Sequence, residues 1–138
     1  MKSFYKGMIL FFIGGSVYCG IELLVRNGYT HLSMFIVGGL AFLLVGALNE
    51  YLPWKWSITT QALVGGVCIT AMEFISGCIL NLWFELNIWD YSLEQYQILG
   101  QISLLHSCYW CGLSLVAIWL DDTIRWLLFD EEMPMYRL

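Results

Sequence analysis

The sequence predicts an all-α integral membrane protein, a bundle of four transmembrane helices with both termini in the cytoplasm. Hydrophobic residues make up 59% of the 138 residues and charged residues 12%. Typical soluble domains contain roughly 45–50% hydrophobic residues and about 25% charged residues. The apolar residues gather in long runs separated by short polar breaks. An α-helix needs roughly 20 such residues to cross a bilayer core, so each run is a candidate span.

The first two runs predict helices over about residues 4–25 and 31–48. The first begins like a signal peptide but lacks a convincing small-residue cleavage site and carries Glu22, so we expect a retained helix. The break at 26–30 contains Gly28, a turn former. The second helix should end before Pro53, which disfavours helical geometry in the preceding residue. Trp54 and Trp56 are suited to the membrane interface.

The third and fourth runs predict helices over about 57–86 and 98–120, followed by a short amphipathic tail over 121–138. The tail mixes apolar residues with acids. It could lie on the membrane surface or pack against the bundle. With a length of 138 residues, the chain should form a single transmembrane domain, 1–138.

The loop charges predict the orientation of the bundle. Four spans place the N-terminus, the second connection and the tail on one side of the membrane. That side holds five of the six Lys and Arg residues, and the opposite side holds only Arg26. Because positive charge concentrates in cytoplasmic loops, both termini should be cytoplasmic. The five basic residues on the side of the termini are Lys2, Lys6, Lys55, Arg125 and Arg137.

Composition also excludes several classes of function. With six basic residues and no basic cluster, nucleic-acid binding is not expected. The five cysteines are odd in number and mostly fall in apolar runs, so we interpret them as small apolar fillers. No phosphate-binding glycine loop and no nucleophile–base set is present, so we expect no enzyme, no cofactor and no resident metal. Any ATP-driven step would need another chain.

Glu73 is the main functional candidate because it lies near the middle of the third apolar run. A carboxylate at that depth is costly in lipid and should face protein or water. Glu22 lies in the first run and could share a polar site with it. The structural alternatives are an interhelical strut for Glu73 and a helix-stabilising i, i+4 pair of Glu22 with Arg26.

Glycines inside the predicted helices favour close helix packing. Gly14-Gly15 precede Glu22 by the same interval at which Gly65-Gly66 precede Glu73. Two related helix hairpins would produce this pattern, as would coincidence.

Two further groups are weaker candidates for the same site. The segment HSCYWCG contains His106 and a Cys-x-x-Cys pair. A zinc site usually needs four ligands, so a polar helix face is the simpler interpretation. His106 could still be the hydrogen-bond partner that a buried Glu73 requires. In the third connection, Asp90 and Glu94 with Trp89 and Tyr91 could cap the outer mouth of a site or merely close a loop.

Several stretches of the chain resemble a family of small bacterial membrane proteins. These stretches are LNEYLPWKWSITTQALVGG, MEFISGCILNLWFELNIWDYS, LGQISLLHSCYW and LDDTIRWLLFDEEMPMYRL. The sequence is similar to the CmpB-like family of type IV ABC-transporter permeases from Tyr18 onward. Glu73, Gly77, Trp89-Asp90-Tyr91-Ser92 and Gly100 carry the most specific part. The resemblance implies a multi-pass protein of the bacterial plasma membrane.

The sequence therefore favours a permease-like membrane subunit for a small solute or ion. The predicted binding residues are Glu73, Glu22, His106, Asp90, Tyr91 and Trp89. Four helices enclose little volume, so we expect a homo-oligomer or a partner membrane subunit within the bilayer. The alternative is a structural or regulatory membrane protein that transports nothing.

Overall fold

The computed structural model describes residues 2–52 and 56–138, which are mostly helical. Three predictions fall outside the described residues: the helix end before Pro53, the interfacial position of Trp54 and the cytoplasmic position of Lys55. The elements in chain order are α1 (Lys2–Val25), α2 (Leu32–Tyr51), α3 (Ile58–Gly77), the π-helical turn η1 (Cys78–Trp83), β1 (Gln97–Ile98), β2 (Ile102–Ser103) and α4 (Leu104–Phe129). The all-α prediction is confirmed, apart from the short antiparallel hairpin β1–β2.

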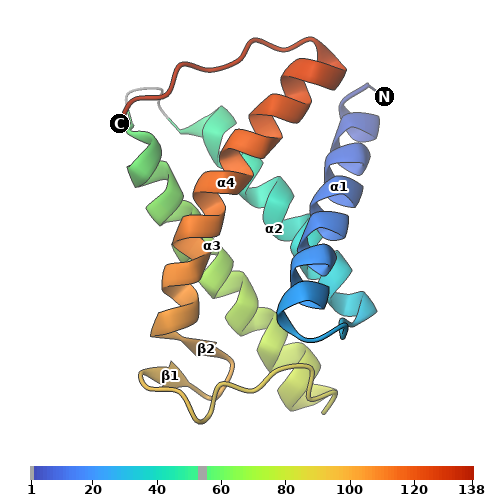
Figure 1. Ribbon diagram of the computed structural model, residues 1–138, viewed down its shortest axis with the longest axis vertical. Coiled ribbons are helices and arrows are strands. Elements are labelled where there is room, and N and C mark those ends of the chain that lie inside the picture. Colours follow the sequence, from blue (N-terminus) through green and yellow to red (C-terminus); the bar gives the residue numbers. More distant parts are fainter. Residues whose placement is uncertain (1, 53–55) are drawn as a thin grey trace.

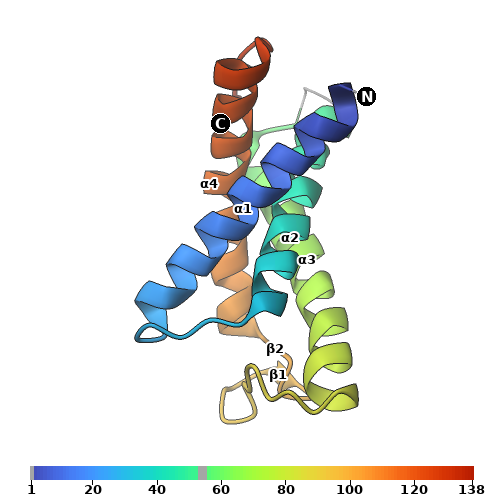
Figure 2. The ribbon, with the colours of Figure 1, turned by 90° about the vertical axis from the view of Figure 1, so that its right-hand side faces the viewer.

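The helices form two antiparallel hairpins that pack against each other. Most contacts lie within the pairs α1–α2 and α3–α4, and α2 makes most of the contacts between the pairs. Both chain ends lie at one end of the bundle, and the β1–β2 hairpin lies at the other (Figure 1). The view in Figure 2 shows α2 between α1 and α3. We call the two ends the termini end and the hairpin end.

Glycines bring the helices of each pair into direct backbone contact. A Cβ at Gly14 would lie 2.3 Å from the Phe42 side chain on α2, and one at Gly66 would lie 2.3 Å from Cys111 Sγ on α4. Only a hydrogen fits at these points. The predicted close approach of the helices at these glycines is thus confirmed.

Among the described residues, three helices are long and apolar enough to cross a membrane: Lys2–Val25, Ile58–Trp83 and Leu104–Phe129. The apolar part of α2, Leu32–Leu48, is shorter. Large apolar side chains on the outside of the bundle are widely exposed, among them Leu24 at 85% and Val67 at 68%. Such a surface is suited to lipid contact rather than to water.

The fourth helix differs from the sequence expectation. It begins at Leu104 instead of near 98, because residues 97–103 form the β1–β2 hairpin around Gly100, whose φ is +69°. Ser103 caps the helix by accepting a hydrogen bond from the His106 backbone N–H at 3.3 Å. The helix continues to Phe129 rather than ending near Leu120.

Polar contacts at the termini end explain this extension. Asp121 is 1% exposed and accepts a hydrogen bond from Arg125 Nε at 2.5 Å. Arg125 also pairs with Glu50 and Glu131, each at 3.6 Å. The acids of the DDTIR segment are therefore held by protein groups and do not end the helix. Of the two placements considered for the tail, the structure has it packed against the bundle, where Tyr136 donates to Asp122 at 2.7 Å.

Candidate functional site

Glu73 lies on α3 with its carboxylate directed between the two helix hairpins. The residue is 7% exposed. Its Oε1 accepts a hydrogen bond from the Tyr91 hydroxyl at 2.9 Å, and its Oε2 accepts one from Trp110 Nε1 at 2.8 Å. Both donors are neutral, so the hydrogen bonds satisfy the carboxylate without supplying a positive charge.

Tyr91 is held in place by a loop that folds back over the end of α3. Asn81 in η1 donates to Gln101 Oε1 at 2.8 Å and accepts from the Ile88 N–H at 2.7 Å. Trp89 is buried, and its Nε1 donates to the Gln101 carbonyl at 3.0 Å. The loop therefore has a fixed course. Burial raises the pKa of the Tyr91 phenol, and the neighbouring Glu73 raises it further, so Tyr91 remains a donor at neutral pH.

The hypothesis that His106 is the hydrogen-bond partner of Glu73 is wrong. His106 Nδ1 lies 3.2 Å from Glu94 Oε2 and 3.0 Å from Ser103 Oγ. The imidazole stacks on the Tyr91 ring, with centroids 4.0 Å apart. His106 lies in the first turn of α4, one turn before Trp110, which makes the contact with Glu73 instead. His106 thus reaches Glu73 only through Tyr91.

Glu22 on α1 makes the predicted i, i+4 pair with Arg26, at 3.5 Å. It also accepts a hydrogen bond from Thr30 Oγ1 at 2.8 Å and a longer one from the Tyr18 hydroxyl at 3.5 Å. Arg26 Nη2 donates to the Ile88 carbonyl at 2.5 Å. This last bond ties the first helix hairpin to the loop that follows η1.

A large open cavity at the hairpin end brings all six predicted site residues together. Its volume is about 940 Å³. It is lined by Glu22, Glu73, Trp89, Asp90, Tyr91 and His106, together with Tyr18, Arg26, Glu94, Cys108, Tyr109, Trp110 and several apolar side chains. Asp90 is exposed and accepts hydrogen bonds from the Ser92 N–H and hydroxyl at 2.8 and 3.0 Å. The acids in this lining outnumber the basic groups.

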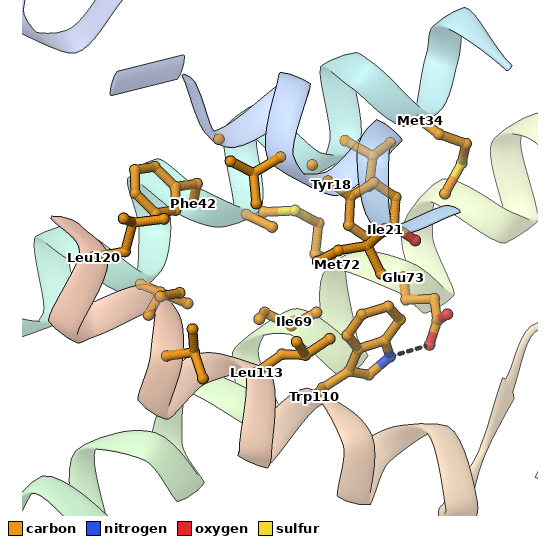
Figure 3. A pocket seen from close by; sticks show the side chains of 18 of the residues that line it. Tyr18, Ile21, Met34, Phe42, Ile69, Met72, Glu73, Trp110, Leu113 and Leu120 are labelled. Atoms are coloured by element: carbon orange, nitrogen blue, oxygen red, sulfur yellow. Dashed lines mark hydrogen bonds between the residues drawn. The ribbon is translucent and has the colours of Figure 1, made fainter. Parts of the chain in front are cut away.

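A second cavity, of about 110 Å³, continues from Glu73 into the bundle. Figure 3 shows Glu73 and Trp110 at one end of it and Phe42 and Leu120 at the other. Its lining is almost wholly apolar, and Glu73 is the only charged side chain among the described residues that line it. Both cavities are lined by a shared set of residues, which includes Tyr18, Met34, Glu73, Trp89 and Trp110. Glu73 therefore lies where a wide cavity with several charged side chains meets a narrow cavity whose other lining residues are uncharged.

Sequence reasoning missed Trp110 and Tyr18 as parts of this site. Trp110 donates to Glu73, and its ring lies 6.1 Å from that of Tyr18. Each lies one helical turn from a residue that was singled out, Trp110 after His106 and Tyr18 before Glu22. That i, i+4 spacing places both on the inward helix face, which was the available signal.

Comparisons with known proteins place this chain in a transporter family. No curated protein and no solved structure matches it. A family does match, over residues 4–130, and this range includes all four helices almost completely and every residue of the site. With its long apolar helices, the chain is a membrane protein that belongs to the family described as "Putative ABC-transporter type IV", CmpB.

Proposed function

We propose that this protein is a permease-like membrane subunit that handles a small solute or ion, with Glu73 as the central binding group. The observation that supports this most is the position of Glu73 at the inner end of an open cavity of about 940 Å³. An acid at membrane depth is costly and is kept where it faces a pathway or a partner. As is usual for transporter components, we propose no enzymatic activity.

The other predicted site residues would have distinct roles. Asp90, Tyr91 and Trp89 would shape the outer mouth, because they belong to the loop that covers the cavity. Tyr91 would also orient the Glu73 carboxylate through its 2.9 Å hydrogen bond. Glu22 and His106 would act from the walls, where Glu22 is paired with Arg26 and His106 with Glu94.

We further propose a single domain with four spans and both termini in the cytoplasm of a bacterial cell. The antiparallel α1–α2 pair supports a second span, even though the apolar part of α2 is shorter than the others. The shared position of the two chain ends is compatible with an even number of spans (Figure 1). The broad exposed apolar surface would meet lipid, a second copy or a partner subunit.

The function can be tested by uptake of radiolabelled methylammonium, a small cation, into liposomes that contain the purified protein. We expect uptake above that of protein-free liposomes, and we expect Glu73→Gln to abolish it because the amide keeps the shape but loses the charge. Glu85→Gln is the matched control, since Glu85 is an exposed acid at the same end of the bundle that lines neither cavity. Uptake that is identical in wild type and Glu73→Gln would contradict the proposal.

A structural or regulatory role is the second candidate. One observation favours it: both Glu73 oxygens already accept hydrogen bonds from protein donors. As a strut, Glu73 would hold the loop and α4 against α3. This role predicts that Glu73→Gln lowers the unfolding temperature in detergent while uptake never exceeds that of protein-free liposomes for either protein.

A further inference from the structure

The two cavities that meet at Glu73 differ in size and in charge, because the wide one is lined by several charged side chains and the narrow one is otherwise lined by uncharged ones. From this we propose that the site takes an amphipathic organic cation, with its charged head in the wide cavity and a small apolar group in the narrow one. The inference rests on the proposed function and names the class of ligand. It follows from the size and lining of the narrow cavity, the charge of the wide one and the rings around the carboxylate.

The narrow cavity sets the size of the apolar group. It measures about 110 Å³ and is lined by aliphatic, methionine and aromatic side chains. An apolar cavity of about 150 Å³ stays dry and binds benzene. A single ring or a short alkyl chain therefore matches the volume of this space. The proposed ligand is thus a small free amphiphile.

The wide cavity sets the charge of the head. Glu22, Glu73, Asp90 and Glu94 line it, against Arg26 and His106. The two basic groups are already engaged, Arg26 with Glu22 and His106 with Glu94. Within the described part of the chain, Glu73 accepts hydrogen bonds only from neutral donors, so its negative charge has no cation in direct contact there. A bound cation would supply that charge, while an anion would be repelled.

Aromatic rings around Glu73 favour an alkylammonium over a hydrated metal ion. Tyr18, Tyr91 and Trp110 all border the wide cavity beside the carboxylate. Ring faces attract cations, and quaternary ammonium groups are recognised in this way. By contrast, the described residues contain no group of three or more His, Cys, Asp or Glu side chains that could hold a metal ion.

The test measures equilibrium binding by titration calorimetry on the full-length protein in lipid nanodiscs. Benzyltrimethylammonium is the probe, tetramethylammonium is its head alone, and phenylacetate carries the ring with a negative charge. Burying a ring of this size strengthens binding about tenfold or more. We expect benzyltrimethylammonium to bind at least about tenfold more tightly than tetramethylammonium, and phenylacetate not to bind.

Variants test the binding of the charged head and the binding of the apolar group separately. Ala41 lines only the narrow cavity, so Ala41→Leu should reduce benzyltrimethylammonium binding to the tetramethylammonium level and leave tetramethylammonium unchanged. Val37→Leu serves the same purpose if the first variant does not fold. Ala71→Leu, at an exposed position of α3, is the matched control. Glu73→Gln should weaken both cations about tenfold or more, and Glu85→Gln neither.

The outcomes distinguish the two proposals. Equal binding of the two cations, with both weakened by Glu73→Gln, would overturn the head-and-ring inference and leave the proposed function standing. Cation binding that is unchanged by Glu73→Gln would overturn both the inference and the proposed function. Phenylacetate binding as tight as that of benzyltrimethylammonium would also overturn the inference.

Discussion

At the scale of single residues, the hydrogen bonding of the Glu73 carboxylate depends on two side chains from different parts of the chain. Tyr91 reaches it from the loop and Trp110 from α4. The sequence indicated Glu73 because an acid inside an apolar run is unusual, and it indicated Tyr91 through the polar WDYS segment. It could not identify Trp110 as a partner, because that depends on how α4 is rotated against α3. For the same reason it assigned the contact to His106.

Replacing Tyr91 with Phe should destabilise the protein at neutral pH. The change removes the donor to Glu73 Oε1 and leaves part of a buried carboxylate unsatisfied, which costs about 1–3 kcal/mol. Tyr96→Phe, at an exposed position in the same loop, should have little effect. Denaturant unfolding in detergent measures the difference between the two variants.

Comparing the unfolding of wild type and Tyr91→Phe at different pH values tests the raised pKa of Tyr91. Because folding raises this pKa, the stability that it contributes is complete below the ordinary tyrosine pKa of about 10 and is lost as the pH rises above it. Wild type should therefore lose more stability than Tyr91→Phe above about pH 10. A constant difference across this range would show that the phenol is not linked to folding.

At the scale of elements, hydrophobic runs predicted the helices well and turn chemistry predicted the connections poorly. The first three helices begin within two residues of their expected starts, because an apolar run and a capping residue act locally. The region 98–103 is predicted to begin a helix because Ile98, Leu99 and Ile102 are apolar. It turns back instead, with Tyr96 and Leu99 at positive φ, a conformation that neither residue type signals.

The glycine contacts within each hairpin predict a large effect from a single methyl group. Gly66→Ala would place a Cβ 2.3 Å from Cys111 Sγ and 2.8 Å from the Cys111 backbone nitrogen. Forcing α3 from α4 should cost about 1–3 kcal/mol. Gly20→Ala is the control, because no heavy atom lies within 4 Å of its added Cβ. It should be neutral or stabilise by about 0.5–1 kcal/mol. Equal unfolding temperatures for the two variants would contradict the close packing.

At the scale of the whole molecule, composition predicted a membrane protein, and the family match agrees with it. The cavities could not be predicted, because they lie between two helix hairpins and depend on residues from α1 to α4. The ends of the bundle also differ in charge. Described basic residues at the termini end include Lys6, which pairs with Glu131, and Arg125, while the hairpin end carries Arg26 and the acidic cavity. This asymmetry underlies the proposed orientation.

Thiol labelling tests most directly whether Glu73 is reached by water from the hairpin end. Glu73→Cys is made in a protein whose five native cysteines are replaced by serine and whose unfolding temperature matches wild type. A membrane-impermeant maleimide is then added to either face of sealed vesicles. Ala71→Cys, at an exposed position on the same helix, is the lipid-facing control. Our account predicts labelling of Cys at position 73 from the non-cytoplasmic face only, with position 71 unlabelled. A folded protein whose position 73 resists labelling from both faces would contradict it.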